Sequence, residues 1–243
     1  MVNHQMSSEL PGLFITGTDT NVGKTYVAAM IVRALVVAGK KVGVYKPAAS
    51  GCRQSGNELI SDDALALWEA AGRPGPLEYV CPQRFAAPLA PHLAARAEGR
   101  EIDRELLLAG LAYWRERSEV VVVEGAGGLL SPLADKFYVA DLAAAFGLPL
   151  VIVAPNRIGV INQTLQTVHA AQSYRSGLRI AGVVLNETND PATNDDPSRS
   201  TNLAELRLHS PATILGAVAG GSERIEPNVN WWEIALQAQH SLK

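Results

Sequence analysis

Cysteine is scarce in this sequence of 243 residues, which has only Cys52 and Cys81. Neither stands in the spacing of metal ligands and no cysteine–histidine cluster accompanies them, so neither a disulfide framework nor a zinc site is expected. A reducing cytoplasm is the simplest compartment for such a chain. A run of the ~18 apolar residues that a membrane helix needs is missing, and residues 1–12 lack the basic start and apolar core of a secretion signal. We therefore expect a cytoplasmic protein without a membrane segment.

An excess of positive charge is missing as well, since the formal net charge is −3 at pH 7. The composition therefore gives no reason to expect binding to nucleic acid or to an anionic membrane. The sequence shows no internal repeats and no low-complexity linker, while 47% hydrophobic and 19% charged residues are typical of a soluble globular enzyme. We expect a single domain over residues 1–243, with a disordered N-terminal segment at 1–10 and a mobile, turn-rich loop at 188–200.

Apolar runs of strand length alternate with helical segments along the chain. Strands are expected at 13–16, 41–46, 119–123, 149–154, 178–185 and 212–218, and helices at 25–38, 61–72, 103–117, 138–146, 161–176 and 201–208. The proline-rich residues 73–99 predict irregular chain with one or two short helices. Apolar strands separated by helices indicate a mainly parallel sheet covered on both faces, a three-layer α/β fold. Such sheets bind ligands at the carboxyl ends of their strands.

The phosphate loop, as we name residues 17–25 (GTDTNVGKT), follows the first strand and opens the first helix. The usual nucleotide loop has four residues between its glycines, whereas five separate Gly17 from Gly23 here. Loop amides and the helix N-terminus attract phosphate oxygens; Lys24 can add charge at the β- and γ-phosphates, and the Thr25 hydroxyl can bind Mg²⁺. A tight turn with an incidental lysine is the alternative. Because the working end VGKT is unchanged, we expect a P-loop NTPase-like fold.

Lys46 and Ser50 form a second candidate site, in the run VYKPAASG. Lys46 ends a buried strand and is followed by proline, so we expect its side chain to point into the crevice beside the phosphate loop rather than into the core. Ser50 lies on the loop just beyond. The alternative is a solvated lysine at a strand end.

Asp63 and Glu124 form a possible metal pair, because Mg²⁺ beside nucleotide phosphates takes one or two carboxylates. Glu124 follows four valines and begins EGAGG, which we expect to be a turn at the strand end. Asp63 lies in the first turn of a helix, where an N-cap or a favourable interaction with the helix dipole is the alternative, and Glu124 could be a buried acid without a function. Asn186 follows the strand at 178–185 and could read a purine base or start a turn.

Together these motifs resemble the dethiobiotin synthetase family. The runs ITGTDTNVGKT, YKPAASG, SDDALAL, FAAPLAPHLAA, VVEGAGG and IGVINQTL occur in that family's order over about the first three quarters of the chain. The family carries the same elongated loop. The resemblance implies a ligase that forms the ureido ring of dethiobiotin from 7,8-diaminononanoate, CO₂ or bicarbonate, and ATP, through a carbamate and a carbamic-phosphoric anhydride.

The resemblance also implies roles for individual residues. Lys46 would be catalytic, together with Lys24 and Thr20, and Ser50 would contact the substrate. Mg²⁺ would be bound by Thr25, Asp63 and Glu124. Nucleotide contacts would come from Asn21, Val22, Gly23, Lys24, Thr25, Tyr26, Asp63, Glu124, Gly125, Ala126, Gly127 and Asn186.

Members of the family are homodimers, and the resemblance implies an active site at the subunit interface. The substrate carboxylate would be received by the neighbouring subunit's Ile158, Gly159, Val160, Ile161 and Asn162, where a helix N-terminus would suit it. The sequence departs from the family at Asn21, where some members have an acid. It departs again at GAVAGGSE, residues 216–223, which replaces a proline-containing stretch that helps to hold base and ribose.

Other functions remain possible on this fold. A partitioning ATPase, a non-enzymatic nucleotide switch, carries a second lysine in its loop, KGGVGKT, where this chain has Asp19. Amide-forming relatives such as the cobyrinic acid amidating enzymes add a glutaminase domain with a catalytic cysteine, and neither cysteine here stands on a nucleophile elbow. An unrelated kinase is also open, because GKT does not identify the acceptor.

Overall fold

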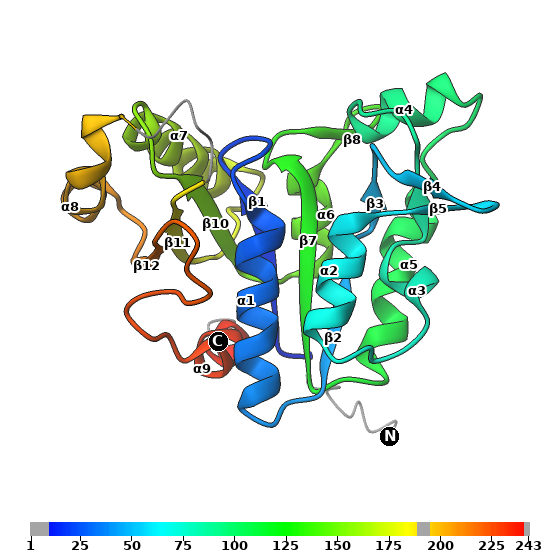
Figure 1. Ribbon diagram of the computed structural model, residues 1–243, viewed down its shortest axis with the longest axis horizontal. Coiled ribbons are helices and arrows are strands. Elements are labelled where there is room, and N and C mark those ends of the chain that lie inside the picture. The colour runs from blue at the N-terminus through cyan, green and yellow to red at the C-terminus, as the bar shows by residue number, and fades with distance from the viewer. Residues whose placement is uncertain (1–9, 189–194, 241–243) are drawn as a thin grey trace.

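Six parallel strands form the central sheet of the computed structural model, which describes residues 10–188 and 195–240 (Figure 1). Their order is β12-β11-β10-β1-β7-β2. The bounds are β1 Gly12–Gly17, β2 Val42–Tyr45, β7 Val120–Gly128, β10 Leu150–Pro155, β11 Ile180–Asn186 and β12 Ile214–Val218. Every residue of β1, β2 and β10 is buried, which explains why these strands read as unbroken apolar runs.

Helices cover both faces of this sheet, as the alternation of strands and helices predicts (Figure 1). One face carries α1 (Lys24–Val37), α2 (Asp62–Ala70) and α9 (Trp231–His240); the other carries α5 (Arg104–Arg115), α6 (Val139–Phe146) and α7 (Val160–Ser173). The helix α8 (Asn202–His209) packs against α7 and β12 at the edge of the sheet. The three-layer P-loop NTPase-like fold expected from the sequence is confirmed. Most element ends lie within three residues of the expected positions.

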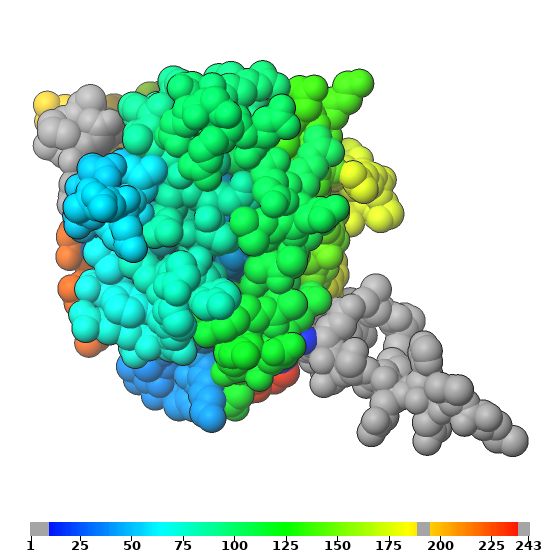
Figure 2. All heavy atoms as spheres, turned by 90° about the vertical axis from the view of Figure 1, so that its right-hand side faces the viewer, coloured from blue at the N-terminus to red at the C-terminus, as the bar shows by residue number. Residues whose placement is uncertain are grey.

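Shorter elements surround the end of β2. They are β3 (Ala48–Ala49), paired with β6 (Gln83–Arg84); the hairpin of β4 (Arg53–Ser55) and β5 (Glu58–Ile60); α3 (Leu77–Val80); and α4 (Pro91–Ala97). The expectation of one or two short helices between 73 and 99 is therefore confirmed, and the structure has two there. A second hairpin pairs β8 (Pro132–Ala134) with β9 (Phe137–Tyr138). Seen from the side of β2, the surface is formed largely by the cyan and green segments of this part of the chain (Figure 2).

The run EGAGG is not the turn expected from its glycines. The strand β7 continues through it to Gly128, and Gly17 at the end of β1 pairs with Gly128 after a shift in register. A Cβ on Gly125 would lie 2.8 Å from Val139 Cγ1, so the absence of a side chain permits close packing here. The glycines thus allow an extended strand beside the phosphate loop instead of reversing the chain.

Two expectations fall wholly or partly outside the described residues. The N-terminal segment at 1–10 lies outside them except for Leu10, and so does the part of the 188–200 loop at 189–194. Disorder and mobility there stay predictions. From Asp196 onward the loop forms one turn of 3-10 helix, Pro197–Ser200, which the Asp196 side chain caps by accepting a hydrogen bond from the Ser198 amide.

Trp114 is expected to make one of the larger contributions to the free energy of unfolding. Its side chain is fully buried between α5 and β2, and its indole donates a hydrogen bond to the Tyr79 carbonyl over 3.1 Å. We expect Trp114→Ala to lower the unfolding free energy by about 3–5 kcal/mol, because it leaves a cavity and an unpaired carbonyl. Leu108→Ala, on an exposed position of the same helix, is the control. Urea denaturation measures both, and equal losses would contradict the assignment.

Candidate active site

The phosphate loop connects β1 to α1 at the carboxyl edge of the sheet, which is uppermost in Figure 1. Two of its residues have left-handed backbone, Asn21 at φ 58° and Gly23 at φ 83°. Asparagine and glycine are the residues that tolerate this conformation best. Lys24 begins α1 and is buried, and its ammonium donates a hydrogen bond over 3.0 Å to the carbonyl of Asp19 within the same loop. The expected strand–loop–helix unit is therefore confirmed.

Lys46 follows β2 directly and lies in the crevice beside the phosphate loop, as expected. Only 3% of its surface is exposed, so the solvated alternative is wrong. Its Nζ lies 2.5 Å from Glu124 Oε1 and 3.0 Å from Asp63 Oδ2, and it also donates to the Gly125 carbonyl over 3.2 Å. Burial alone would lower the pKa of Lys46, but the two carboxylates outweigh burial and raise it. Lys46 is thus a fixed positive charge.

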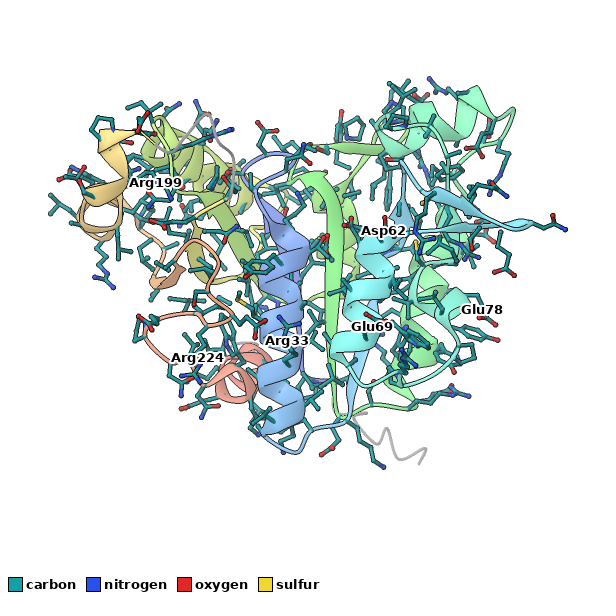
Figure 3. The ribbon with its side chains drawn as sticks, in the orientation of Figure 1. Arg33, Asp62, Glu69, Glu78, Arg199 and Arg224 are labelled. Carbon is teal, nitrogen blue, oxygen red and sulfur yellow. The ribbon has the colours of Figure 1, made fainter. Side chains whose placement is uncertain are left out.

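Glu124 and Asp63 converge on this ammonium from β7 and α2. The Glu124 side chain is fully buried; its Oε1 also accepts a hydrogen bond from the Thr25 hydroxyl over 2.9 Å, while its Oε2 has no hydrogen-bond partner. Burial would raise the pKa of Asp63, but the positive charge of Lys46 lowers it. The N-cap of α2 is Ser61, so the capping role considered for Asp63 is wrong. Its neighbour Asp62, labelled in Figure 3, pairs instead with Arg53 on the surface.

Lys24 is the second lysine of the site, and its pKa is affected by Lys46. Burial lowers the pKa of Lys24 to about 8, and the like charge of Lys46 acts in the same direction. Two buried ammonium groups thus stand beside two carboxylates at the end of the phosphate loop. The lysines and the helix N-terminus can neutralise an anion, while the carboxylates and the Thr25 hydroxyl offer oxygen atoms to a cation.

These groups line one cavity of about 500 Å³. All of its lining residues except Ala49 were expected from the sequence: Thr20, Asn21, Gly23, Lys24, Thr25, Tyr26, Lys46, Ser50, Asp63, Glu124, Ala126 and Gly127. Val22 and Gly125 were also expected to contact nucleotide, but neither lines the cavity: Val22 is buried, and the Gly125 carbonyl accepts a hydrogen bond from Lys46. Ala49 carries no chemical group that could have identified it in advance.

Tyr26 makes a contact that the sequence did not suggest. Its hydroxyl donates a hydrogen bond over 2.7 Å to the carbonyl of Ser222, in the segment 216–223 that departs from the family pattern. Serine carbonyls give no sequence signal, so this contact could not have been predicted. The first turn of α1 and the segment after β12 therefore stand together.

Two predicted groups lie outside the cavity lining. Asn186, at the end of β11, donates from its side-chain nitrogen to the Val22 carbonyl over 3.0 Å, so it is neither a turn residue nor free to offer its whole amide to a base. Residues 158–162 stand at the N-terminus of α7, where Ile158 is 76% exposed and its amide donates over 2.5 Å to Asp196 Oδ2. Their expected role in a neighbouring subunit stays a prediction.

Residues 10–188 and 195–240 contain neither a clustered metal site nor a helix that could cross a membrane. No group of three or more histidine, cysteine, aspartate or glutamate side chains gathers there as a metal site. A cation held by Asp63 and Glu124 would therefore need further oxygen atoms from a bound ligand or from water. Within the same residues, no helix has the length and apolar character needed to cross a membrane.

Comparison with known proteins narrows the function. A family described as an AAA domain matches residues 11–222. The chain is 50% identical over 195 residues to the ATP-dependent dethiobiotin synthetase BioD of Anaeromyxobacter dehalogenans (strain 2CP-C), covering 80% of this chain and 83% of that protein. It is 44% identical over 205 residues to the protein of the same name from Rhodopirellula baltica, covering 80% and 78%.

Solved structures show a likeness in fold alone. A putative plasmid partition protein from Borrelia burgdorferi bound to AMPPNP superposes with a TM-score of 0.51 at 12% identity, covering 95% of this chain and 98% of that one. The signal recognition particle receptor FtsY from Elizabethkingia anophelis in complex with GDP gives a TM-score of 0.54 at 14% identity, covering 100% and 67%. These proteins place the architecture among nucleotide-binding folds, whereas the sequence relatives indicate the chemistry.

Proposed function

The chain belongs to the ATP-dependent dethiobiotin synthetases, ligases of biotin synthesis, and on that premise we propose that its cavity closes the ureido ring of dethiobiotin from 7,8-diaminononanoate and CO₂. The observation that carries the proposal is the position of Lys46, a buried and permanently charged lysine in the cavity that the phosphate loop lines. Phosphate binding alone needs only the loop. A second buried ammonium beside it provides for a second anion.

In the first step an amine of the substrate adds to CO₂ and releases a proton, which leaves a carbamate anion. The positive charges of Lys46 and Lys24 favour the unprotonated amine that this addition needs, because like charges disfavour an ammonium. The same charges stabilise the carbamate once it forms. Thr20 and Ser50 also line the cavity and offer hydroxyl groups to the carbamate.

In the second step a carbamate oxygen attacks the γ-phosphorus of ATP, and the bond to the ADP oxygen breaks. Lys24, at the base of the phosphate loop, neutralises charge on the transferred group, as in other phosphoryl transfers. The second amine then attacks the carbamoyl carbon, loses a proton and expels phosphate. The products are dethiobiotin, ADP and phosphate.

The residues present fit a magnesium ion. Glu124 Oε2 is a buried acceptor without a partner, and the Thr25 hydroxyl and Asp63 carboxylate supply the other oxygen atoms that Mg²⁺ prefers. We propose that Thr25, Asp63 and Glu124 hold it. When bound, Mg²⁺ would neutralise negative charge on the nucleotide phosphates.

We also propose that two copies of the chain complete each site. Residues 158–162 lie outside the cavity of their own chain but expose a helix N-terminus, which suits the substrate carboxylate of a neighbouring subunit. In the isolated chain Asp196 accepts from the Ile158 amide there, so a carboxylate is already a suitable ligand.

Both cysteines are free and buried, in keeping with a cytoplasmic location.

Only the fold favours the alternative of a nucleotide switch. Such a switch carries a second lysine in its loop, and this chain has Asp19 at that position. In this chain it is the Asp19 carbonyl that contacts Lys24. A switch would hydrolyse ATP without a small-molecule acceptor, whereas a ligase would not.

Release of ADP is therefore expected to require both the diamine and bicarbonate. The measurement is ADP formation in CO₂-free buffer with each component omitted in turn, and ¹³C-bicarbonate should place its label in the ring carbonyl of the product. Omission of either component should reduce ADP release to the uncoupled background. Hydrolysis that is indifferent to both would overturn the ligase reaction.

A further inference from the structure

Asn186 makes a long-range contact with the phosphate loop that the proposed chemistry does not use. It lies at the end of β11, is 2% exposed, and donates from Nδ2 to the Val22 carbonyl, 164 residues away in sequence, over 3.0 Å. Because a carbonyl only accepts hydrogen bonds, the nitrogen of the amide must face Val22. The contact is so close that a Cβ on Gly23 would lie 2.1 Å from Asn186 Nδ2.

The hydrogen bond acts on one peptide unit of the loop. The Val22 carbonyl and the Gly23 amide belong to the same planar trans peptide, so they point in opposite directions. Holding the carbonyl towards β11 therefore directs the Gly23 N–H away from β11. Gly23 itself lines the cavity that contains Lys24 and Thr25. An amide directed into that cavity is a donor for a phosphate oxygen.

The backbone around Asn186 is well suited to hold its side chain still. The Asn186 carbonyl accepts from the Asn156 amide over 2.7 Å, and the residue pairs with Val218 of β12. The next residue, Glu187, accepts hydrogen bonds from the Asn156 side chain and the Gly220 amide, and pairs with Arg199 at 3.2 Å. Figure 3 shows Arg199 at this side of the molecule, beyond β10 and β11.

We infer that Asn186 is a positioning residue for the phosphate loop: its Nδ2 fixes the Val22–Gly23 peptide so that the Gly23 amide faces the phosphates. The inference rests on the proposed function only in that the cavity binds nucleotide phosphates. It differs from base recognition, because it acts on ligands that have no base. Asn186 Oδ1 is buried without a partner and is the atom left over for a base amine.

Binding of inorganic tripolyphosphate separates the two roles. If Asn186 positions the loop, Asn186→Ala should weaken both ATP and tripolyphosphate, the latter by about 10-fold, as expected for loss of one hydrogen bond that orders a charged site. If Asn186 only contacts the base, ATP should weaken and tripolyphosphate should not. Titration calorimetry measures both ligands. Unchanged tripolyphosphate affinity would overturn the positioning role.

Gln83→Ala is the matched control. Gln83 is another buried side-chain amide, and its Nε2 donates to the Asp103 carbonyl over 2.8 Å without contacting the phosphate loop or the residues around Asn186. Its replacement should lower stability and leave tripolyphosphate affinity at the wild-type value. An equal loss in both variants would attribute the effect to general destabilisation and overturn the inference.

A spectroscopic measurement covers the case in which the alanine variant does not fold. Asn186→Leu keeps the approximate size and the neutrality of the side chain and removes the donor to Val22; the Oδ1 atom that is also lost has no hydrogen-bond partner. The ¹H–¹⁵N signal of the Gly23 amide should shift in this variant without any ligand, and the Gly39 signal, at the far end of α1, should not. An unmoved Gly23 signal would contradict the inference. Failure of the wild type to bind either ATP or tripolyphosphate would instead overturn the proposed function itself.

Discussion

Lys46→Met is expected to abolish carbamate-dependent ATP turnover while nucleotide still binds. The ammonium of Lys46 is the fixed charge nearest to Glu124 and Asp63, and the phosphate loop retains Lys24 and its amides when Lys46 is removed. Loss of a single charge-stabilising donor typically reduces kcat by about 10²–10³-fold, and we expect at least that loss here. Steady-state ADP release with diamine and bicarbonate measures turnover, and titration with ATP measures binding.

The same replacement should destabilise the protein, which gives an independent readout. It leaves the fully buried Glu124 without its 2.5 Å partner, and removing one member of a buried ion pair costs about 3–5 kcal/mol. Lys40→Met is the control, since Lys40 stands at the far end of α1 with its ammonium over the Trp232 ring. We expect nearly wild-type turnover from that variant. Wild-type turnover from Lys46→Met would remove Lys46 from the reaction.

The sequence predicted Lys46 and the acid pair as separate sites, and the structure joins them. Lys46 and Glu124 are 78 residues apart, and they meet because β2 and β7 are neighbouring parallel strands whose carboxyl ends share one edge. The alternation of strands and helices in the sequence predicts a parallel sheet whose carboxyl ends share one edge, so the position of the crevice could be predicted. The identity of the partners could not, because it depends on how α2 delivers Asp63 to the same point.

The sequence analysis missed the helix α9 near the C-terminus and several short elements that have no periodic signal. The hairpin β4–β5 is short and largely exposed, so it has no alternation of apolar and polar residues to recognise. The glycines of EGAGG were read as turn residues, whereas in β7 they permit contact with Val139 and with β1. A glycine needed for close packing and a glycine needed for a turn look alike until the neighbouring chain is known.

Asn186 shows the same limit at a functional residue. Its position after an apolar strand is compatible with a turn, with base recognition, and with the hydrogen bond to Val22. Only the fold, which brings the Val22 carbonyl within 3.0 Å of Asn186 Nδ2, reveals the hydrogen bond. The sequence analysis expected both Asn186 and Gly23 to contact nucleotide, but it could not predict that they contact each other.

Gly23→Ala should strongly weaken nucleotide binding, and Gly39→Ala should leave it unchanged. Both glycines have left-handed backbone, at φ 83° and φ 77°, and they flank the same helix, α1. An alanine at either position carries a conformational strain of roughly 1–2 kcal/mol. Nothing lies within 4 Å of a Cβ at Gly39, whereas at Gly23 the new methyl group would overlap Asn186 Nδ2.

The difference between the two variants therefore measures the overlap, with backbone strain cancelled. In Gly23→Ala either the loop or Asn186 must move, and both movements turn the Val22–Gly23 peptide away from the phosphates. We expect ATP affinity to fall by at least about 100-fold, which corresponds to 2.7 kcal/mol or more. Calorimetric titration with ATP, beside thermal unfolding of both variants, is the measurement. Equal ATP affinities of the two variants at equal unfolding temperatures would show that nucleotide binding by the phosphate loop does not depend on the contact between Gly23 and Asn186.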